Sequence, residues 1–236
     1  MLGNLSAFLL TLSRIPNSPI FFSFQLCIYR DKEFEYSENV RMNRVPVAWE
    51  AISWESTSLS GWVQGLIARH EQLHRWLTSG RPNSFWLTGF LNPQGFLTAV
   101  KQEVMRHHAK EGWALDDVVL KSDVTRFTSA NSIRESLPAG SGVYIHGLFL
   151  EGCIWSVNEG KLKDPQPRKL FSSLPVVRIT AVLAKDANEG SGYYYAPCYK
   201  AKRRTQANFI TKLRLKTEEA PARWVLRGAA VLCDVD

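Results

Sequence analysis

The residues best suited to chemistry form a basic cluster that directly follows a tyrosine-rich segment. The segment YYYAPCY occupies residues 193–199, and the cations of the cluster are Lys200, Lys202, Arg203 and Arg204. Aromatic rings and cations on a β-barrel can bind single-stranded nucleic acid through stacking and charge. The same pattern also fits a solvated loop after a packed strand, or a surface that docks an acidic protein. All three interpretations stay open from these residues alone.

The histidines offer two further candidates for chemistry. His70 and His74 are four residues apart and could share a metal ion, but the sequence has no evident third ligand, so we expect both to face solvent. His146 interrupts an apolar segment. Because no nucleophile motif accompanies it, we expect it to be buried and satisfied by a backbone or carboxylate partner. Glu151 is a candidate partner for His146 or for an arginine such as Arg227.

The sequence lacks the motifs of common catalytic and nucleotide-binding sites. It has no GxxxxGKS or GxxxxGKT loop to hold phosphates, and no GxSxG, HExxH or GxGxxG. No CxxC pair occurs, so neither a zinc knuckle nor a redox motif is present among Cys27, Cys153, Cys198 and Cys233. We therefore expect reduced thiols, no metal, no cofactor, no catalytic site and no ATP binding in this segment.

Composition and the first residues set the broad class. The protein has 236 residues, of which 45% are hydrophobic, and a formal net charge of +7. These values are typical of a globular protein with a real core, and the charge favours an acidic partner surface. Residues 1–29 are apolar, but Arg14, Pro16 and Pro19 leave no uninterrupted stretch near the ~20 residues of a spanning helix. We expect no membrane segment, no signal peptide and an intracellular location.

Helical periodicity dominates the first half of the sequence after this opening. Leucines and tryptophans recur at helical spacing over residues 59–77, with serines before them and Gly80 and Pro82 after them. Asn92 and Pro93 begin a second predicted helix over residues 93–110, with Phe96, Val100 and Val104 on one face. These two helices predict a helical subdomain over residues 41–115.

A strand pattern follows. Short apolar segments separated by Gly, Pro, Asn and Asp predict strands at 118–124, 143–150, 154–157, 176–182, 193–199, 207–215 and 229–233. The predicted fold class is therefore α+β: the helical subdomain, then a partly open antiparallel β-barrel over residues 116–236. Gly147 is expected to let another backbone approach the 143–150 strand closely. Large or interrupting side chains within the apolar segments are the candidate core anchors: Trp86, Phe90, Phe96, Tyr144, His146 and Trp224.

Seven ordered blocks carry a resemblance to a known family. The longest are SFWLTGFLNPQGFLTAV at 84–100 and GVYIHGLFLEG at 142–152. The others are VPVAWE at 45–50, the tryptophan-containing segment 59–76, LPVV at 174–177, YAPCYK at 195–200 and WVLRGAAVL at 224–232. Together they resemble the C-terminal domain of dynein heavy chains, and WALDDVVLKSDVT at 113–125 is most similar to axonemal outer-arm chains. Residues 1–40 fall outside the resemblance and are expected to be an extension that is dispensable for folding.

The resemblance implies a noncatalytic domain that lies flat against the AAA+ ring of a minus-end-directed microtubule motor and modulates its motility. The implied partners are the ring of the same polypeptide, the other dynein subunits and microtubules, with no membrane. It makes Lys200, Lys202, Arg203 and Arg204 a candidate docking patch for acidic ring positions. The alternative from another class is a free-standing OB-like protein that binds single-stranded nucleic acid, while a hydrolase would lack a nucleophile motif.

Overall fold

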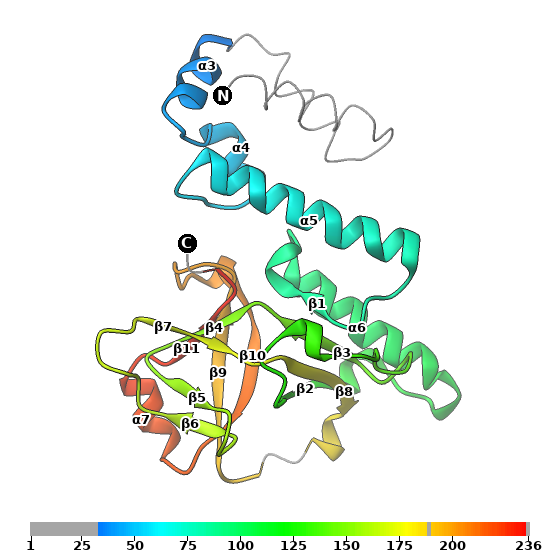
Figure 1. Ribbon diagram of the computed structural model, residues 1–236. Helices are drawn as coiled ribbons and strands as arrows, with labels where there is room; N and C mark the ends of the chain where they lie inside the picture. The colour runs from blue at the N-terminus through cyan, green and yellow to red at the C-terminus, as the bar shows by residue number, and fades with distance from the viewer. Residues whose placement is uncertain (1–32, 188–189, 235–236) are drawn as a thin grey trace. The chain divides into compact units, whose positions relative to one another are not determined.

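The computed structural model describes residues 33–187 and 190–234 of the protein (Figure 1). It contains two compact units, residues 1–64 and 65–236, and the boundary falls within the long helix α5 (Leu59–Ser79). The expected extension over residues 1–40 lies mostly outside the described residues. Its last part belongs to helix α3 (Glu33–Arg41). The three-part division predicted above is a different one and stays a prediction.

The described part of the first unit is helical and is organised around Trp62. It contains α3, α4 (Val47–Ala51) and the start of α5. The Trp62 ring lies 5.3 Å from that of Trp49 and 5.2 Å from that of Trp54, and Trp62 Nε1 donates to Ser53 Oγ at 3.0 Å. Trp62 is only 3% exposed. Burial of such large aromatic surfaces is the main source of stability available to so short a segment.

The start of α5 shows why the helix begins where the sequence predicts. Ser58 Oγ accepts a hydrogen bond from Gly61 N at 3.1 Å, as a helix-capping hydroxyl does. The backbone carbonyl of Asn43 accepts from Leu59 N at 3.0 Å, and its side-chain oxygen accepts from Ser60 N at 3.0 Å. Three amide groups that would lack partners in the first turn are thereby satisfied.

The second unit contains two larger sheets and a hairpin (Figure 1). The four-stranded sheet has the order β1 (Phe85–Trp86), β3 (Val143–His146), β8 (Val177–Leu183) and β2 (Val118–Val124). The five-stranded sheet has the order β10 (Phe209–Lys216), β9 (Tyr193–Tyr199), β11 (Ala230–Leu232), β4 (Leu148–Glu151) and β7 (Phe171–Leu174). The hairpin pairs β5 (Ile154–Ser156) with β6 (Lys161–Lys163).

Neither sheet closes into a barrel, so the α+β class is confirmed but the predicted barrel is not seen. The sheets also contain two parallel pairs, β1 with β3 and β11 with β9, and are therefore not purely antiparallel. The two sheets approach each other where β2 and β10 are in contact. There Arg214 N donates to the side-chain oxygen of Ser122 at 2.6 Å, so this amide is satisfied by a hydroxyl instead of by a strand ladder.

Gly147 divides the segment that the sequence predicted as one strand into β3 and β4. Its φ of 79° is left-handed, which favours glycine, and it resets the alternation of side chains. Val143 and Ile145 point inward before it, whereas Leu148 and Leu150 do so after it, so β3 joins one sheet and β4 the other. The close neighbour at Gly147 is the Trp86 ring, not the backbone that the sequence suggested.

Helix α6 (Pro93–His107) packs on the four-stranded sheet through β2 and β8. Asn92 caps it by accepting from Gly95 N at 2.9 Å, and Pro93 occupies the first turn, both as predicted. The most buried face carries Leu97, Val100 and Val104, while Phe96 is half-buried beside it. Leu97 and Val100 belong to the same core cluster as the strands, so α6 and the sheets form one hydrophobic core.

Helix α7 (Pro221–Leu226) was not predicted, although Pro221 supplies the expected signal for a first helical turn. It buries Trp224 completely, and Trp224 Nε1 donates to Thr217 Oγ1 at 2.8 Å. Helix α3 was not predicted either, because it falls largely in the segment interpreted as an extension. The sequence pattern also missed several short elements, among them α4, β1, β6 and β7, which have five residues or fewer and are too short to display a period.

Candidate docking surface and pocket

The basic cluster lies on the connection between strands β9 and β10. The strands pair antiparallel from Tyr193 opposite Lys216 to Tyr199 opposite Phe209, and the connection is closed by a hydrogen bond from Lys200 N to Asn208 O at 2.7 Å. The sequence therefore placed all four cations of the docking patch in one surface segment. Their side chains do not share one environment.

Two of the four cations are engaged by the protein itself. Lys200 Nζ donates to the backbone carbonyl of Leu91 at 3.1 Å, and burial lowers the pKa of Lys200, with the Arg69 charge acting in the same direction. Arg204 donates to Gly228 O at 2.7 Å and to Glu151 Oε2 at 2.5 Å. Glu151 thus pairs with Arg204, not with either of the partners considered from sequence. These two side chains help to fix the connection to the body of the domain.

The other two cations face solvent. Lys202 is exposed, and its Nζ lies 5.8 Å from the centroid of the Phe171 ring. Arg203 is exposed, and within residues 33–187 and 190–234 its side chain forms no ion pair. An acidic partner would therefore find two cations here that are not already engaged by the domain, instead of four. That is enough for electrostatic steering and for a weak contact, but not for a deep anion site.

The tyrosines before the cluster are divided between the two faces of β9. Tyr194 is buried, and its hydroxyl donates to Ala229 O at 2.7 Å. Tyr199 is half-buried with its ring 6.0 Å from that of Phe209. Tyr199 shares the outer face with Tyr193 and Tyr195, of which Tyr195 is 40% exposed. The stacking platform that would suit nucleic acid is correspondingly smaller than the sequence suggested.

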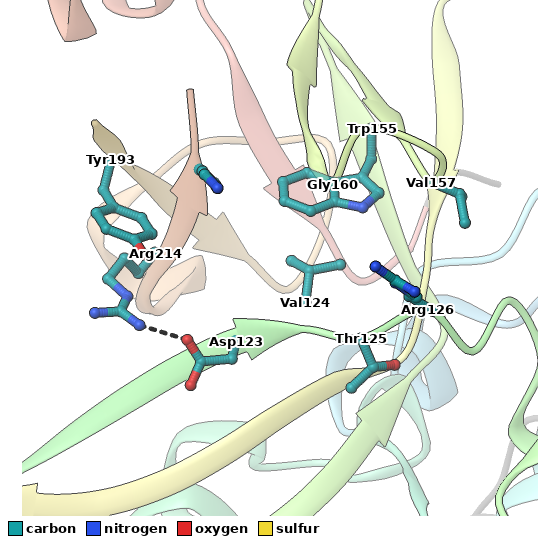
Figure 2. Close-up of a pocket in the computed structure, with 10 residues that line it drawn as sticks. Asp123, Val124, Thr125, Arg126, Trp155, Val157, Gly160, Tyr193 and Arg214 are labelled. Atoms are coloured by element: carbon teal, nitrogen blue, oxygen red, sulfur yellow. Dashed lines mark hydrogen bonds and ion pairs between the residues drawn. The ribbon is translucent and has the colours of Figure 1, made fainter. Parts of the chain in front are cut away.

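A pocket opens beside the outer face of β9 and β10 (Figure 2). It has a volume of about 180 Å³. Strand β2 and the residues after it contribute Asp123, Val124, Thr125 and Arg126; the β5–β6 hairpin contributes Trp155, Val157 and Gly160; β9 and β10 contribute Tyr193, Arg214 and Lys216. Sequence reasoning missed this pocket, although the alternation of cations with leucines in TKLRLK at 211–216 was a signal for one basic strand face.

Arg214 is the central side chain of this pocket. It forms an ion pair with Asp123, and its guanidinium lies 4.3 Å from the centroid of the Tyr193 ring. Its side chain is 11% exposed. The Nε atom of Arg214 is buried and has no hydrogen-bond partner. The guanidinium is therefore held in place while one of its donors remains unsatisfied.

The six candidate core anchors differ in burial. Trp224 is fully buried, whereas Trp86, Phe90, Phe96, Tyr144 and His146 are half-buried. Phe90 and Phe96 stack with ring centroids 4.2 Å apart, and Trp76 of α5 contacts both rings edge-on. This aromatic cluster joins the second half of α5 to α6. The anchoring role of the individual residues stays a prediction.

Among the described residues, the histidines belong to no cluster that could hold a metal ion. His146 Nδ1 is buried and unpartnered, contrary to the expected hydrogen bond, and burial lowers the pKa of His146. The rings of His70 and His74 stack with centroids 5.6 Å apart. No group of three or more His, Cys, Asp or Glu residues able to hold a metal occurs in the part of the protein that the structure describes. Arg227, which the sequence suggested as a possible partner of Glu151, pairs with Asp164 at 3.4 Å instead.

A hydrogen-bonded junction around Thr88 was also missed from sequence. Thr88 Oγ1 donates to the carbonyls of Cys233 at 2.5 Å and Gly147 at 3.2 Å, while Thr88 O accepts from Arg69 Nη2 at 3.2 Å. Burial lowers the pKa of Arg69 to about 10, a change that the Asp234 charge opposes. Since its partners are mostly backbone atoms, this junction is structural: it ties α5 to the 3-10 helix η1 (Leu87–Gly89), to Gly147 between β3 and β4, and to Cys233 after β11.

The described cysteines are poorly suited to nucleophilic chemistry. Cys153, Cys198 and Cys233 are free and buried, and burial raises the pKa of the Cys153 thiol to about 12. A thiol with such a pKa is a poor nucleophile.

Among the residues with described positions, no helix has the length and apolar character needed to cross a membrane.

Comparison with known proteins identifies the family that this fold and these blocks represent. Residues 30–233 match the family model for the C-terminal domain of the dynein heavy chain, and the protein belongs to that family. The match begins at residue 30, so it includes residues 30–40, which fell outside the resemblance seen in the sequence.

Curated relatives include axonemal proteins. The sequence is 47% identical over 195 residues to the Dynein gamma chain, flagellar outer arm, of Chlamydomonas reinhardtii, and the match covers 82% of this protein and 4% of that one. It is 44% identical over 198 residues to Dynein axonemal heavy chain 8 of Homo sapiens, where the match covers 84% of this protein and 4% of that one. The protein thus spans only a small part of the length of these relatives. Both relatives are named as flagellar or axonemal dyneins, which confirms the resemblance to axonemal dyneins seen in the sequence.

Proposed function

We propose that this protein is the C-terminal, noncatalytic domain of an axonemal dynein heavy chain. In this proposal it braces the AAA+ ring and modulates minus-end-directed movement along microtubules in cilia or flagella, as part of the cytoskeleton. The observation that carries the proposal is the family match over residues 30–233, together with relatives named for the flagellar outer arm and the axoneme. The partners would be the ring of the same polypeptide and, through the whole motor, dynein subunits and microtubules.

The domain itself would perform no chemistry and bind no cofactor. The absence of a phosphate-binding loop from the sequence supports this view, because backbone amides and a lysine are what hold nucleotide phosphates. Titration calorimetry of the 236-residue protein with ATP and magnesium checks it. We expect no heat of binding, and stoichiometric binding would contradict the noncatalytic assignment.

Docking on the ring would use exposed cations such as Lys202 and Arg203, because Lys200 and Arg204 are held by the domain itself. Such a contact needs only modest affinity, since tethering within one polypeptide supplies a high effective concentration. A patch with two available cations instead of four is consistent with a contact of modest affinity.

Deletion of residues 45–236 from the complete motor polypeptide tests the function. We expect ATP hydrolysis to persist while its coupling to microtubule movement changes, seen as altered gliding velocity or altered stimulation of the ATPase by microtubules. The control is the complete polypeptide with Lys110→Gln, an exposed cation outside the patch. Unchanged velocity, force and stimulated ATPase after the deletion would show that the domain does not modulate motility.

The alternative, a protein that binds single-stranded nucleic acid, rests on Tyr193 and Tyr195 facing outward opposite Lys216 and Arg214. Fluorescence anisotropy with a labelled oligothymidine measures it directly. Tight binding that falls with added salt and is lost in a Lys202→Gln/Arg203→Gln variant would favour this alternative. We expect only weak binding.

A further inference from the structure

The pocket beside Arg214 has more positive charge than its acidic lining residue can neutralise. Arg126, Arg214 and Lys216 line it together with one carboxylate, Asp123. Asp123 is paired with Arg214. Over residues 33–187 and 190–234, neither Arg126 nor Lys216 forms an ion pair. Two cations at its walls therefore have no counter-charge from the described part of the domain.

The position of Arg214 is fixed before any ligand arrives. The Tyr193 ring lies against the Arg214 guanidinium, and Asp123 forms an ion pair with it. The backbone amide of Arg214 donates a hydrogen bond to the Ser122 hydroxyl. A cation that is already immobilised loses little side-chain entropy when it binds an anion. Its buried, unpartnered Nε is a donor for which the described residues offer no acceptor.

The pocket also has an apolar side. Figure 2 shows Trp155 and Val124 on one side of the pocket, with Arg126 next to them, and the group Tyr193, Arg214 and Asp123 on the other. A ligand that fits both sides has a short hydrocarbon stem and an anionic end. Glutamate and aspartate side chains have this form.

Size and charge favour a single carboxylate over a nucleotide or a phosphate. Pockets that bury whole organic ligands are about 300–1,000 Å³ in volume. This one is about 180 Å³. A phosphate would bring about two negative charges next to Asp123, whereas a carboxylate brings one, and like charges at close range are unfavourable.

We propose that this pocket binds the carboxylate of a glutamate or aspartate presented by an acidic segment of a partner protein. Arg126 and Lys216 supply the free positive charge, Arg214 supplies fixed hydrogen-bond donors, and Trp155 packs on the stem of the bound side chain. The inference does not depend on the motor function proposed above, since it follows from the pocket alone.

Binding of a fluorescein-labelled decaglutamate peptide to the 236-residue protein tests the proposal, with decaglutamine as the uncharged control peptide. We expect Arg126→Gln and Lys216→Gln each to weaken decaglutamate binding about fivefold, near the upper end for an exposed charge pair. Both side chains are exposed, so the melting temperature should not change. Lys212→Gln is the matched control, because Lys212 is an exposed cation on the same face of β10 that does not line the pocket. It should change binding by less than about twofold.

Each other outcome overturns the proposal. Equal weakening by Lys212→Gln would mean that decaglutamate responds to general surface charge. Equal binding of decaglutamine would mean that the carboxylates are not recognised. Tighter binding of an oligothymidine that depends on Arg126 and Lys216 would assign the pocket to nucleic acid, and displacement of decaglutamate by inorganic phosphate at matched ionic strength would assign it to small anions. No measurable binding of decaglutamate would also refute it.

Discussion

Replacing Gly147 with alanine tests the backbone break that sends β3 and β4 into different sheets. The φ of 79° costs an L residue about 1–2 kcal/mol relative to glycine. An added Cβ would also lie 2.7 Å from Trp86 Nε1 and closer still to Trp86 Cδ1. Over-packing of this kind costs about 1–3 kcal/mol. The expected loss in the free energy of unfolding is therefore about 2–5 kcal/mol.

The matched control for this prediction is Gly112→Ala. Gly112 has a similar φ of 74°, but a Cβ added there would meet no atom within 4 Å. The free energy of unfolding of the Gly112→Ala variant should fall only by the cost of the left-handed conformation, about 1–2 kcal/mol. Urea unfolding followed by tryptophan fluorescence measures both variants. If the two substitutions cost the same, the contact between Gly147 and Trp86 does not determine the break, and the argument from close packing is wrong.

Three further predictions concern capping, pH and burial. Asn92→Ala should lower the free energy of unfolding by about 1 kcal/mol in a urea titration, because Gly95 N loses its capping acceptor; no loss would contradict the cap. His146→Phe should flatten the pH dependence of stability: burial lowers the folded-state pKa of His146, so its cost appears as the pH falls below the unfolded value of 6.5. An unchanged difference between variant and parent from about pH 8 to about pH 5 would contradict this. Trp224→Phe should cost about 2 kcal/mol in the same urea assay through the lost bond to Thr217 and the space left behind, and an unchanged midpoint would contradict it.

Long periodic segments could be predicted from the sequence because their own residues determine them. Strand β9 has the predicted bounds, and α5 begins at the predicted residue because Ser58 caps it. The break at Gly147 was not predicted as a change of sheet. Glycine in a strand signals a special conformation, but the ring that fills the space comes from Trp86, far away in the sequence.

The candidate site was predictable only in part, for the same reason. The sequence located the four cations of the basic cluster, but it could not show that Lys200 would reach the carbonyl of Leu91 or that Arg204 would pair with Glu151. The pocket combines residues from β2, from the β5–β6 hairpin and from β9 and β10. Such a juxtaposition depends on the tertiary fold, so no local pattern of residues could reveal it.

The place of β11 in the five-stranded sheet has a consequence for the order of folding during synthesis. This strand lies between β9 and β4, so it joins the pair β10–β9 to the pair β4–β7. A ribosome makes β4, β7, β9 and β10 before β11, whereas the four-stranded sheet is complete once β8 has been made. Until Ala230 reaches its partner Glu151, the pairs β10–β9 and β4–β7 have no strand between them, and their facing edges lack the partner that β11 supplies. Exposed edges of this kind promote misassociation, so the interval before β11 emerges is when the nascent domain most needs protection by chaperones.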